Sequence, residues 1–190
     1  MGEPSVIDWT EGESAFSARW QSESGQPPPR RMAVADDRMS ADDAYGLACQ
    51  GTALLWRGDF QNGRQLLRAL ASRAERPAGK AGREKPAADP AGAFHRHRQA
   101  QAQRARTLGA LLVLLEPGYG LGLRRAPDWR EACREAWGDG ETPVVVSLRE
   151  LLGLVGAHEW RKKGIEVSAA GGRIHPHYGV FAPIRQEYVD

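Results

Sequence analysis

The chain contains the apolar run Leu111-Leu112-Val113-Leu114-Leu115, which leads directly into Glu116-Pro117-Gly118-Tyr119-Gly120-Leu121-Gly122. Five consecutive apolar residues bounded by glycine-rich segments are typical of a strand that is buried on both faces. Helical patterns precede this strand, whereas short strands and helices are mixed after it. The sequence therefore predicts an α+β fold, in which an N-terminal helical hairpin is followed by a mixed layer of helices and strands.

The predicted hairpin occupies residues 40–73. Ser40 is a good N-cap for a helix that is expected to run to about Trp56. Gly58 ends this helix, and Asp59 caps a second helix that is expected to run to about Arg73. The residues before Ser40 are rich in Gly, Ser, Glu, Gln and Pro without a clear hydrophobic period, so residues 1–39 are predicted to be a disordered tail.

Downstream of the hairpin, residues 77–90 form a flexible Pro/Ala/Gly/Lys loop, and further elements are predicted from hydrophobic periodicity and capping signals. Ser147 and Glu150 have the spacing of a capping box at the start of one of these helices. The predicted elements are helices at 91–107, near 127–137 and at 148–163, a strand at 143–146, and a hairpin of strands at 165–167 and 173–181.

Bulk composition excludes several classes of protein. Of the residues, 41% are apolar and 26% are charged, and no apolar run approaches the ~18 residues that a membrane span needs. No secretory signal is visible after Met1. The two cysteines, Cys49 and Cys133, are far apart in the sequence. We therefore expect two reduced thiols in a cytoplasmic protein.

The glycine-rich segment after the buried strand has the pattern acid-x-Gly-x-Gly-x-Gly, from Glu116 to Gly122. Glycines in this arrangement let the backbone approach a cofactor. However, Arg124-Arg125-Ala126-Pro127 follows within a few residues, so no full helix begins after the loop. The next strand ends in Ser147 instead of the acid that binds a ribose. A glycine-rich surface turn is the better prediction.

The histidines do not predict a metal site. His175 and His177 share one face if they lie on a strand, which suits a metal. His95 and His97 point about 160° to 200° apart on a helix and cannot chelate together. No Cys or carboxylate lies at ligand spacing beside either pair, so we expect no metal.

The charge is concentrated in one segment. Residues 77–110 hold seven basic and two acidic residues, although the whole chain has a net charge of only +2. Within this segment, residues 95–106 contain no acid. The four arginines of this helix are Arg96, Arg98, Arg104 and Arg106. They could contact successive phosphates of a nucleic acid, and the alternative is that they form a solvated helix face.

Three stretches, spread over residues 40–190, together resemble bacterial class I methyltransferases of the small-methyltransferase type. They are Leu47-Ala48-Cys49-Gln50-Gly51-Thr52-Ala53-Leu54-Leu55-Trp56-Arg57-Gly58-Asp59-Phe60, Phe94-His95-x-His97-Arg98-Gln99-Ala100-Gln101-Ala102-Gln103-Arg104-Ala105, and His175-Pro176-His177-Tyr178-Gly179-Val180-Phe181-x-Pro183-x-Arg185-x-Glu187-Tyr188-Val189.

The resemblance implies an accessory, substrate-side domain at residues 40–174 that precedes a Rossmann-like catalytic domain. Residues 175–190 would be the start of that domain, and the amphipathic segment with Ile184, Tyr188 and Val189 leads us to expect that the chain is the front part of a longer protein. The implied cofactor is S-adenosylmethionine. By position, the segment that packs near the cofactor contains Tyr178, Pro183, Arg185 and Glu187.

The leading hypothesis is therefore that the chain is the N-terminal region of an S-adenosylmethionine-dependent methyltransferase. It would position a substrate, through the arginine helix, for a downstream domain, and would have no methyl transfer activity alone. The methyl acceptor stays open among protein, RNA and small molecules. The alternative is a stand-alone helical adaptor or RNA-binding module that uses the Arg96–Arg106 helix.

Overall fold

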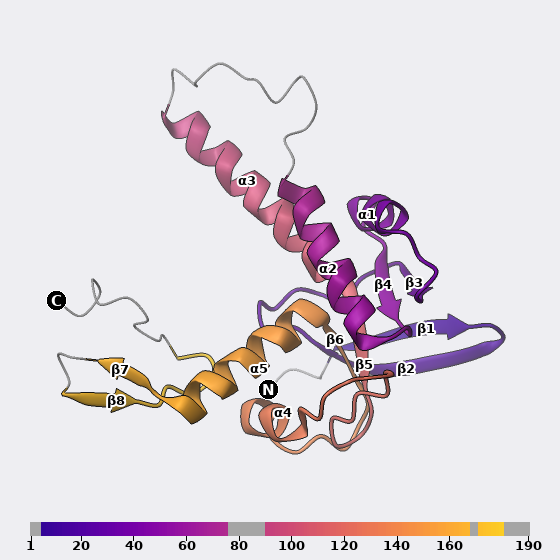
Figure 1. The fold of residues 1–190 in the computed structure, drawn as a ribbon. Helices are drawn as coiled ribbons and strands as arrows, with labels where there is room; N and C mark the ends of the chain where they lie inside the picture. Colours follow the sequence, from indigo (N-terminus) through magenta and orange to yellow (C-terminus); the bar gives the residue numbers. More distant parts are fainter. Residues whose placement is uncertain (1–4, 76–89, 168–170, 181–190) are drawn as a thin grey trace.

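The computed structural model describes residues 5–75, 90–167 and 171–180 (Figure 1). The described residues form helices and strands in alternation, with strands also at the N-terminus. In chain order these are β1 (Val6–Glu11), β2 (Ser14–Gln21), β3 (Met32–Ala35), α1 (Ala41–Cys49), β4 (Ala53–Trp56), α2 (Phe60–Glu75), α3 (Pro90–Gly109), β5 (Leu111–Leu115), α4 (Arg130–Trp137), β6 (Val144–Ser147), α5 (Leu148–Lys163), β7 (Ile165–Val167) and β8 (Gly172–Ile174).

The centre of the fold is a six-stranded mixed sheet in the order β1-β2-β6-β5-β4-β3. Strands β3, β4 and β5 are parallel neighbours, so their carboxyl ends meet at one edge of the sheet. Strand β6 is antiparallel to β5 and parallel to β2, which forms an antiparallel hairpin with β1. A separate two-stranded hairpin is made by β7 and β8. The chain is therefore an α+β protein, as the sequence predicts.

All five helices of the described residues pack on one face of the central sheet. Successive side chains of a strand point to opposite faces, and one alternate set joins the helices in a single buried cluster. The strand residues of this cluster are Ala35, Leu54, Trp56, Leu111, Val113, Leu115, Val144 and Val146. The helix residues include Ala44, Leu66, Leu70, Leu108, Ala132, Cys133, Leu148, Leu151 and Leu154.

The other face of the sheet is covered by the sheet itself. Leu55, Leu112 and Val145 point to this face and are fully buried against Ile7 and Trp9 of β1. Strand β1 is four positions from β4 in the sheet order, yet Glu11 at its end accepts a hydrogen bond of 3.1 Å from Nε of Arg57, directly after β4. The β1–β2 hairpin therefore curls across the helix-free face and closes it.

The prediction that residues 1–39 are disordered is wrong for residues 6–35, which contain three strands. In β1, Ile7 and Trp9 are buried whereas Asp8 and Thr10 are exposed. This alternation is the signature of a half-buried strand. The β1–β2 turn has Gly12 at φ +61°, which a glycine adopts without strain.

The predicted helix to Trp56 is also wrong, and with it the predicted hairpin of residues 40–73. Helix α1 ends at Cys49 because Gly51 adopts a left-handed conformation with φ +77°. The N–H of Thr52 then bonds to the carbonyl of Leu47 at 3.0 Å, the arrangement that closes many helices. The next four residues form the buried strand β4, and the helical hairpin of the structure is made by α2 and α3 instead (Figure 1).

The elements after residue 90 are close to the predictions. The helices at 91–107 and 148–163 and the strands at 111–115 and 143–146 are confirmed within a few residues. The hairpin around Gly171 is also present, but its second strand, predicted over 173–181, is only Gly172–Ile174. The capping box is wrong, because Ser147 makes no side-chain hydrogen bond to the helix. Glu150 instead accepts a hydrogen bond of 3.4 Å from the N–H of Glu23. No helix in the described ranges is both long and apolar enough to span a membrane.

Candidate functional site

Helices α2 and α3 form an arm that projects from the domain (Figure 1). The arm is joined to the core at its base, where Leu66 and Leu70 of α2 and Thr107 and Leu108 of α3 are buried, and Arg73 in the last turn of α2 also pairs with Asp42 of α1. Residues 93–103 of α3 are exposed on all sides. More than half of α3 is therefore in solvent, and this exposed part is accessible to a binding partner.

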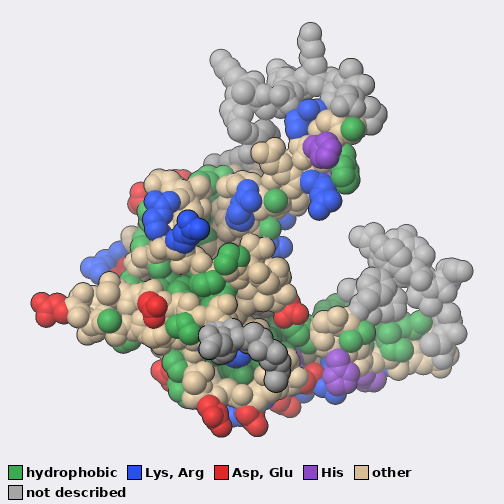
Figure 2. All heavy atoms as spheres, turned by 180° about the vertical axis from the view of Figure 1, so that it is seen from behind, with side chains coloured by type: hydrophobic (Ala, Val, Ile, Leu, Met, Phe, Trp, Pro, Cys, Tyr) green, Lys and Arg blue, Asp and Glu red, His purple; other side chains and the backbone are tan. Residues whose placement is uncertain are grey.

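The arm is strongly basic. Helices α2 and α3 together carry seven arginines and one glutamate, and α3 contains no acid. Figure 2 shows Lys and Arg side chains along the arm, whereas Asp and Glu side chains lie mainly over the rest of the molecule. The single glutamate, Glu75, forms an ion pair with Arg104 of α3 and so ties the two helices together. The arm therefore keeps a large positive excess.

The structure brings the four predicted substrate-binding arginines onto this arm. Arg98 lies over the ring of Phe94, 5.8 Å from its centre, and Arg106 donates a hydrogen bond of 2.8 Å to Gln103. Neither contact neutralises the arginine. Arg96 and Arg98 are two residues apart, so they lie about 200° apart around the helix. The positive charge is consequently spread around the exposed end of α3 and does not form one narrow stripe.

The predicted cofactor segment lies largely outside the described residues. These exclude Pro183, Arg185 and Glu187, and also Ile184, Tyr188 and Val189. Tyr178 is half buried in a turn after β8 and packs on the main core. Burial raises the pKa of the Tyr178 phenol to about 12, and the carboxylates of Glu23 and Glu150 act in the same direction.

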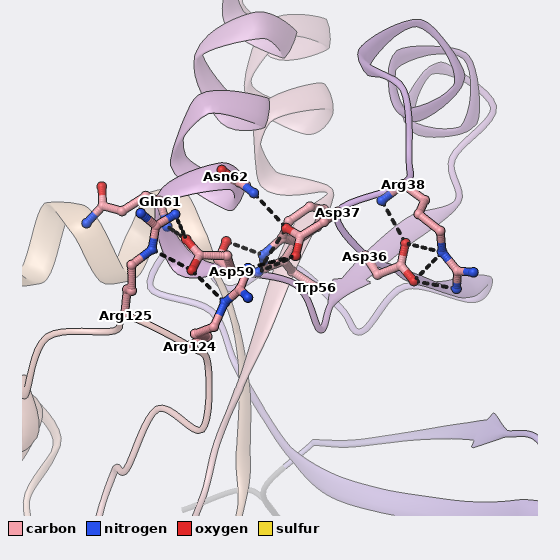
Figure 3. Close-up of polar contacts among 9 residues, drawn as sticks. All are labelled: Asp36, Asp37, Arg38, Trp56, Asp59, Gln61, Asn62, Arg124 and Arg125. Carbon is pink, nitrogen blue, oxygen red and sulfur yellow. Dashed lines mark hydrogen bonds and ion pairs between the residues drawn. The ribbon is translucent and has the colours of Figure 1, made fainter.

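The carboxyl edge of the parallel strands holds a cluster of ion pairs that the sequence did not predict (Figure 3). Asp37 follows β3, Asp59 follows β4, and Arg124 and Arg125 follow the turn after β5. Asp59 accepts hydrogen bonds from Arg125 Nε at 2.6 Å, from Arg125 Nη2 at 2.7 Å and from Arg124 Nε at 3.1 Å. Three loops that are distant in the sequence are joined at this point.

The same cluster caps helix α2. The Asp59 carboxylate accepts a hydrogen bond of 2.8 Å from the N–H of Gln61, and Asp37 accepts one of 2.9 Å from the N–H of Asp59. Asn62 donates a further bond of 3.0 Å to Asp37. These carboxylates satisfy the free N–H groups of the helix start and oppose its positive dipole end. The base of the arm is thereby fixed to the sheet edge.

Asp59 is fully covered, whereas the side chains of Arg124 and Arg125 are 73% and 61% exposed. The Asp59 carboxylate is thus buried at the edge of the domain, partly by the guanidinium groups of Arg124 and Arg125, which are themselves in contact with solvent. The Arg125 guanidinium holds the pKa of the Asp59 carboxyl well below its usual range, although burial acts in the opposite direction. The carboxylate is therefore ionised and fully engaged by its neighbours.

The glycine-rich segment from Glu116 to Gly122 forms a turn that closes on itself. The N–H of Glu116 bonds to the carbonyl of Gly120 at 2.8 Å, and a Cβ on Gly122 would lie 2.9 Å from Oε1 of Glu116. Tyr119 is buried inside the turn, and a Cβ on Gly140 would come within 2.5 Å of its ring. The space beside Gly122 and Gly140 is filled by these two side chains, whereas a Cβ on Gly118 would meet nothing within 4 Å.

The described residues contain no group of three or more His, Cys, Asp or Glu side chains placed to hold a metal ion. Both cysteines are free, with Cys49 exposed and Cys133 buried. Comparison with known protein families, with curated proteins and with solved structures finds no match for this chain.

Sequence reasoning found the basic helix but missed the ion-pair cluster. The available signals were Asp36-Asp37 after Met32–Ala35 and Asp59 after Ala53–Trp56, in each case an acid within three residues of the end of an apolar run. They became informative only once both runs were recognised as neighbouring parallel strands, whose carboxyl ends meet. The arginines that complete the cluster come from more than 60 residues further along the chain, and nothing in the local pattern joins them to Asp59.

Proposed function

We propose that this chain binds RNA through the basic arm formed by α2 and α3. The observation that carries the proposal is the exposed stretch of α3, residues 93–103, in a helix with four arginines and no acid. Arginine side chains on such a helix neutralise phosphates and release the counterions condensed on them. Ionic anchoring of the arm at its base, through Asp59 and Arg125, holds the basic surface in one orientation toward the ligand.

We propose further that the chain is the substrate-side region of an S-adenosylmethionine-dependent methyltransferase, as the resemblance implies. The arm would hold the RNA while a Rossmann-like domain, outside the described residues, binds the cofactor, with Tyr178 and the segment after it on the cofactor side. The cofactor would supply a methyl group for in-line transfer, in which the acceptor–carbon bond forms as the sulfur–carbon bond breaks, and the arm would contribute by holding the acceptor in position.

Two features of the described residues support this division of roles. The carboxyl edge of parallel strands is where α/β folds usually bind a nucleotide, but here Asp59, Arg124 and Arg125 fill it with ion pairs. In the glycine turn, the Glu116 side chain fills the space beside Gly122, and Tyr119 is buried. The chain accordingly provides RNA binding and leaves the cofactor to its partner domain. The two free thiols and an RNA ligand support a cytoplasmic location for this activity.

The RNA proposal is tested by two pairs of matched substitutions. Arg98→Gln/Arg106→Gln removes two charges from the arm, whereas Arg130→Gln/Arg134→Gln removes two exposed charges from α4, outside the arm. In fluorescence anisotropy with a single-stranded RNA of mixed sequence, the arm pair should weaken binding several-fold, whatever the sequence. The α4 pair should bind like the parent chain. Equal losses for the two pairs would contradict a specific role of the arm.

The methyltransferase proposal is tested by calorimetry with S-adenosylmethionine. The 190-residue chain alone should give no binding heat, whereas a longer protein that includes the catalytic domain should bind the cofactor and methylate RNA. Cofactor binding by the chain alone would contradict the division of roles. RNA binding without any methylating domain in the full protein would favour the stand-alone RNA-binding module.

A further inference from the structure

A hollow of about 510 Å³ lies at the far end of α5, away from both the arm and the ion-pair cluster. We call it the Trp160 hollow. It is bounded by the C-terminal part of α5 and by β8, and its walls are mainly apolar. The lining residues are Gly156, Glu159, Trp160, Lys163, Gly164 and Arg173.

The face of Trp160 is left open by its neighbours along the helix. Its side chain is 50% exposed, and the residues four before and four after it are Gly156 and Gly164. Residues four apart lie on the same side of a helix, so no side chain at position 156 covers the indole ring, whereas Gly164 ends the helix and is packed against His175 and Arg173. A Cβ built on Gly156 would meet nothing within 4 Å. The indole is thus available to a planar ligand from solvent.

Two cations stand beside the open indole. Lys163 is one turn further along α5, and Arg173 is held at the hollow by a hydrogen bond of 3.1 Å from its Nη1 to the carbonyl of Lys163. The two basic residues before Lys163 form ion pairs with glutamates of α4: Arg161 pairs with Glu135, and Lys162 pairs with Glu131. Within the described ranges, neither Lys163 nor Arg173 is paired with a carboxylate.

We propose that the Trp160 hollow is a base-stacking subsite for single-stranded RNA, with Lys163 and Arg173 contacting the adjoining phosphates. This inference rests on the proposed RNA binding by the arm. An aromatic face beside cations is the combination that binds single-stranded nucleic acid, because every base has a face to stack and every nucleotide carries a phosphate. The bases of a duplex are already stacked on each other, so a single strand is the ligand that fits.

The position of the hollow agrees with one continuous ligand. Helix α3 and the segment formed by α5 with β7–β8 leave the domain on the same side (Figure 1). In the reverse view an open gap separates these two projecting parts (Figure 2). A strand held by the arginines of α3 would therefore meet the segment formed by α5 with β7–β8 on the side toward which both project. Glu159 at the rim offers an acceptor for a base amino or imino group.

The test compares a decauridylate with an abasic oligonucleotide that has the same ribose-phosphate backbone. Trp160→Ala should weaken binding of decauridylate about tenfold, the loss expected for one stacked base. It should leave binding of the abasic strand unchanged, because the phosphates are the same. Trp160→Phe, which keeps an aromatic face, should retain most of the affinity. Phe16→Ala, which removes another partly exposed aromatic ring from the β1–β2 hairpin, is the matched control and should have no effect.

The outcomes separate this subsite from the arm. If Arg98→Gln/Arg106→Gln weakens RNA binding but Trp160→Ala does not, the stacking subsite is wrong and the proposed function stands. If the arm pair leaves binding unchanged, the proposed function itself fails. An equal loss on the abasic strand would show that Trp160 supports the fold and does not stack a base. Self-association that disappears in Trp160→Ala, with RNA binding intact, would make the hollow a protein contact and overturn the inference.

Discussion

Asp59 and Arg125, which are 66 residues apart in the sequence, form a two-pronged ion pair with oxygen–nitrogen distances of 2.6 and 2.7 Å (Figure 3). Arg125 adopts a left-handed backbone conformation, φ +57°, which is uncommon for a residue with a side chain. The loop after β5 is therefore held in a strained form that places this guanidinium on the start of the arm. The ion pair links the parallel sheet edge to the basic surface.

Asp59→Asn should destabilise the fold. The substitution removes the negative charge that Arg124 and Arg125 share, while the side chain can still cap α2. We expect the Tm to fall by several degrees in thermal unfolding followed by circular dichroism. Asp36→Asn is the matched control because the Asp36–Arg38 pair is at the surface, where such pairs contribute little. A Tm loss in the control as large as that in Asp59→Asn would contradict this role.

The same ion pair predicts how stability depends on pH. Since the folded-state pKa of Asp59 lies below the unfolded value of about 3.9, its contribution is complete above about pH 4. It is lost as the pH falls from there through the lower folded-state pKa. Urea unfolding of the parent chain between pH 5 and pH 2 should thus show a steeper loss of stability than that of Asp59→Asn. If stability falls equally with pH in the parent chain and in Asp59→Asn, the ion pair does not lower the pKa of Asp59 in the folded state.

The two thiols should differ in reactivity. Burial raises the pKa of the Cys133 thiol to about 11, and the side chain is fully covered, whereas Cys49 is exposed. Because the thiolate is the reactive form, one thiol should react with Ellman's reagent at pH 8 in the native protein. Both should react in guanidinium chloride. Cys49→Ser should abolish the native reaction, and rapid reaction of that variant would mean that Cys133 is accessible.

Two helical glycines should respond in opposite directions to alanine. A Cβ on Gly63 of α2 would lie 2.8 Å from the indole nitrogen of the buried Trp56, so Gly63→Ala should destabilise the fold. A Cβ on Gly153 of α5 would meet nothing within 4 Å. Gly153→Ala should therefore raise the free energy of unfolding by about 0.5–1 kcal/mol through helix propensity. Chemical denaturation of both variants measures the difference, and changes of the same sign would contradict the packing around Trp56.

The sequence predicts best those elements whose signals are local. Helix α3, strand β5 and helix α5 are each defined by a long uninterrupted pattern, and the structure has them within a few residues of the prediction. The signal for the end of α1 is also local, since Gly51 follows Gln50 at the position where helices close, but the apolar run after it favours a longer helix. Four apolar residues in a row do not distinguish a buried strand from a buried helix.

The remaining features depend on contacts between distant segments. The β1–β2 hairpin is stable because it covers Leu55, Leu112 and Val145, which become a common surface only after the sheet has formed. The Glu11–Arg57 and Asp59–Arg125 pairs likewise join separate loops. The arginines of α3 were found because charge composition is visible without the fold. That they stand on a projecting arm required the structure.

The salt dependence of RNA binding tests the central claim most directly. The parent chain and a variant with glutamine at positions 96, 98, 104 and 106 are titrated with one single-stranded RNA over a range of potassium chloride concentrations. For single strands, the slope of log K against log salt changes by about 0.7 for each phosphate contact. Because Arg104 is already paired with Glu75, loss of three to four contacts should flatten the slope by about 2.1–2.8, with circular dichroism confirming that the variant is folded. An unchanged slope would show that the arm does not contact the phosphates.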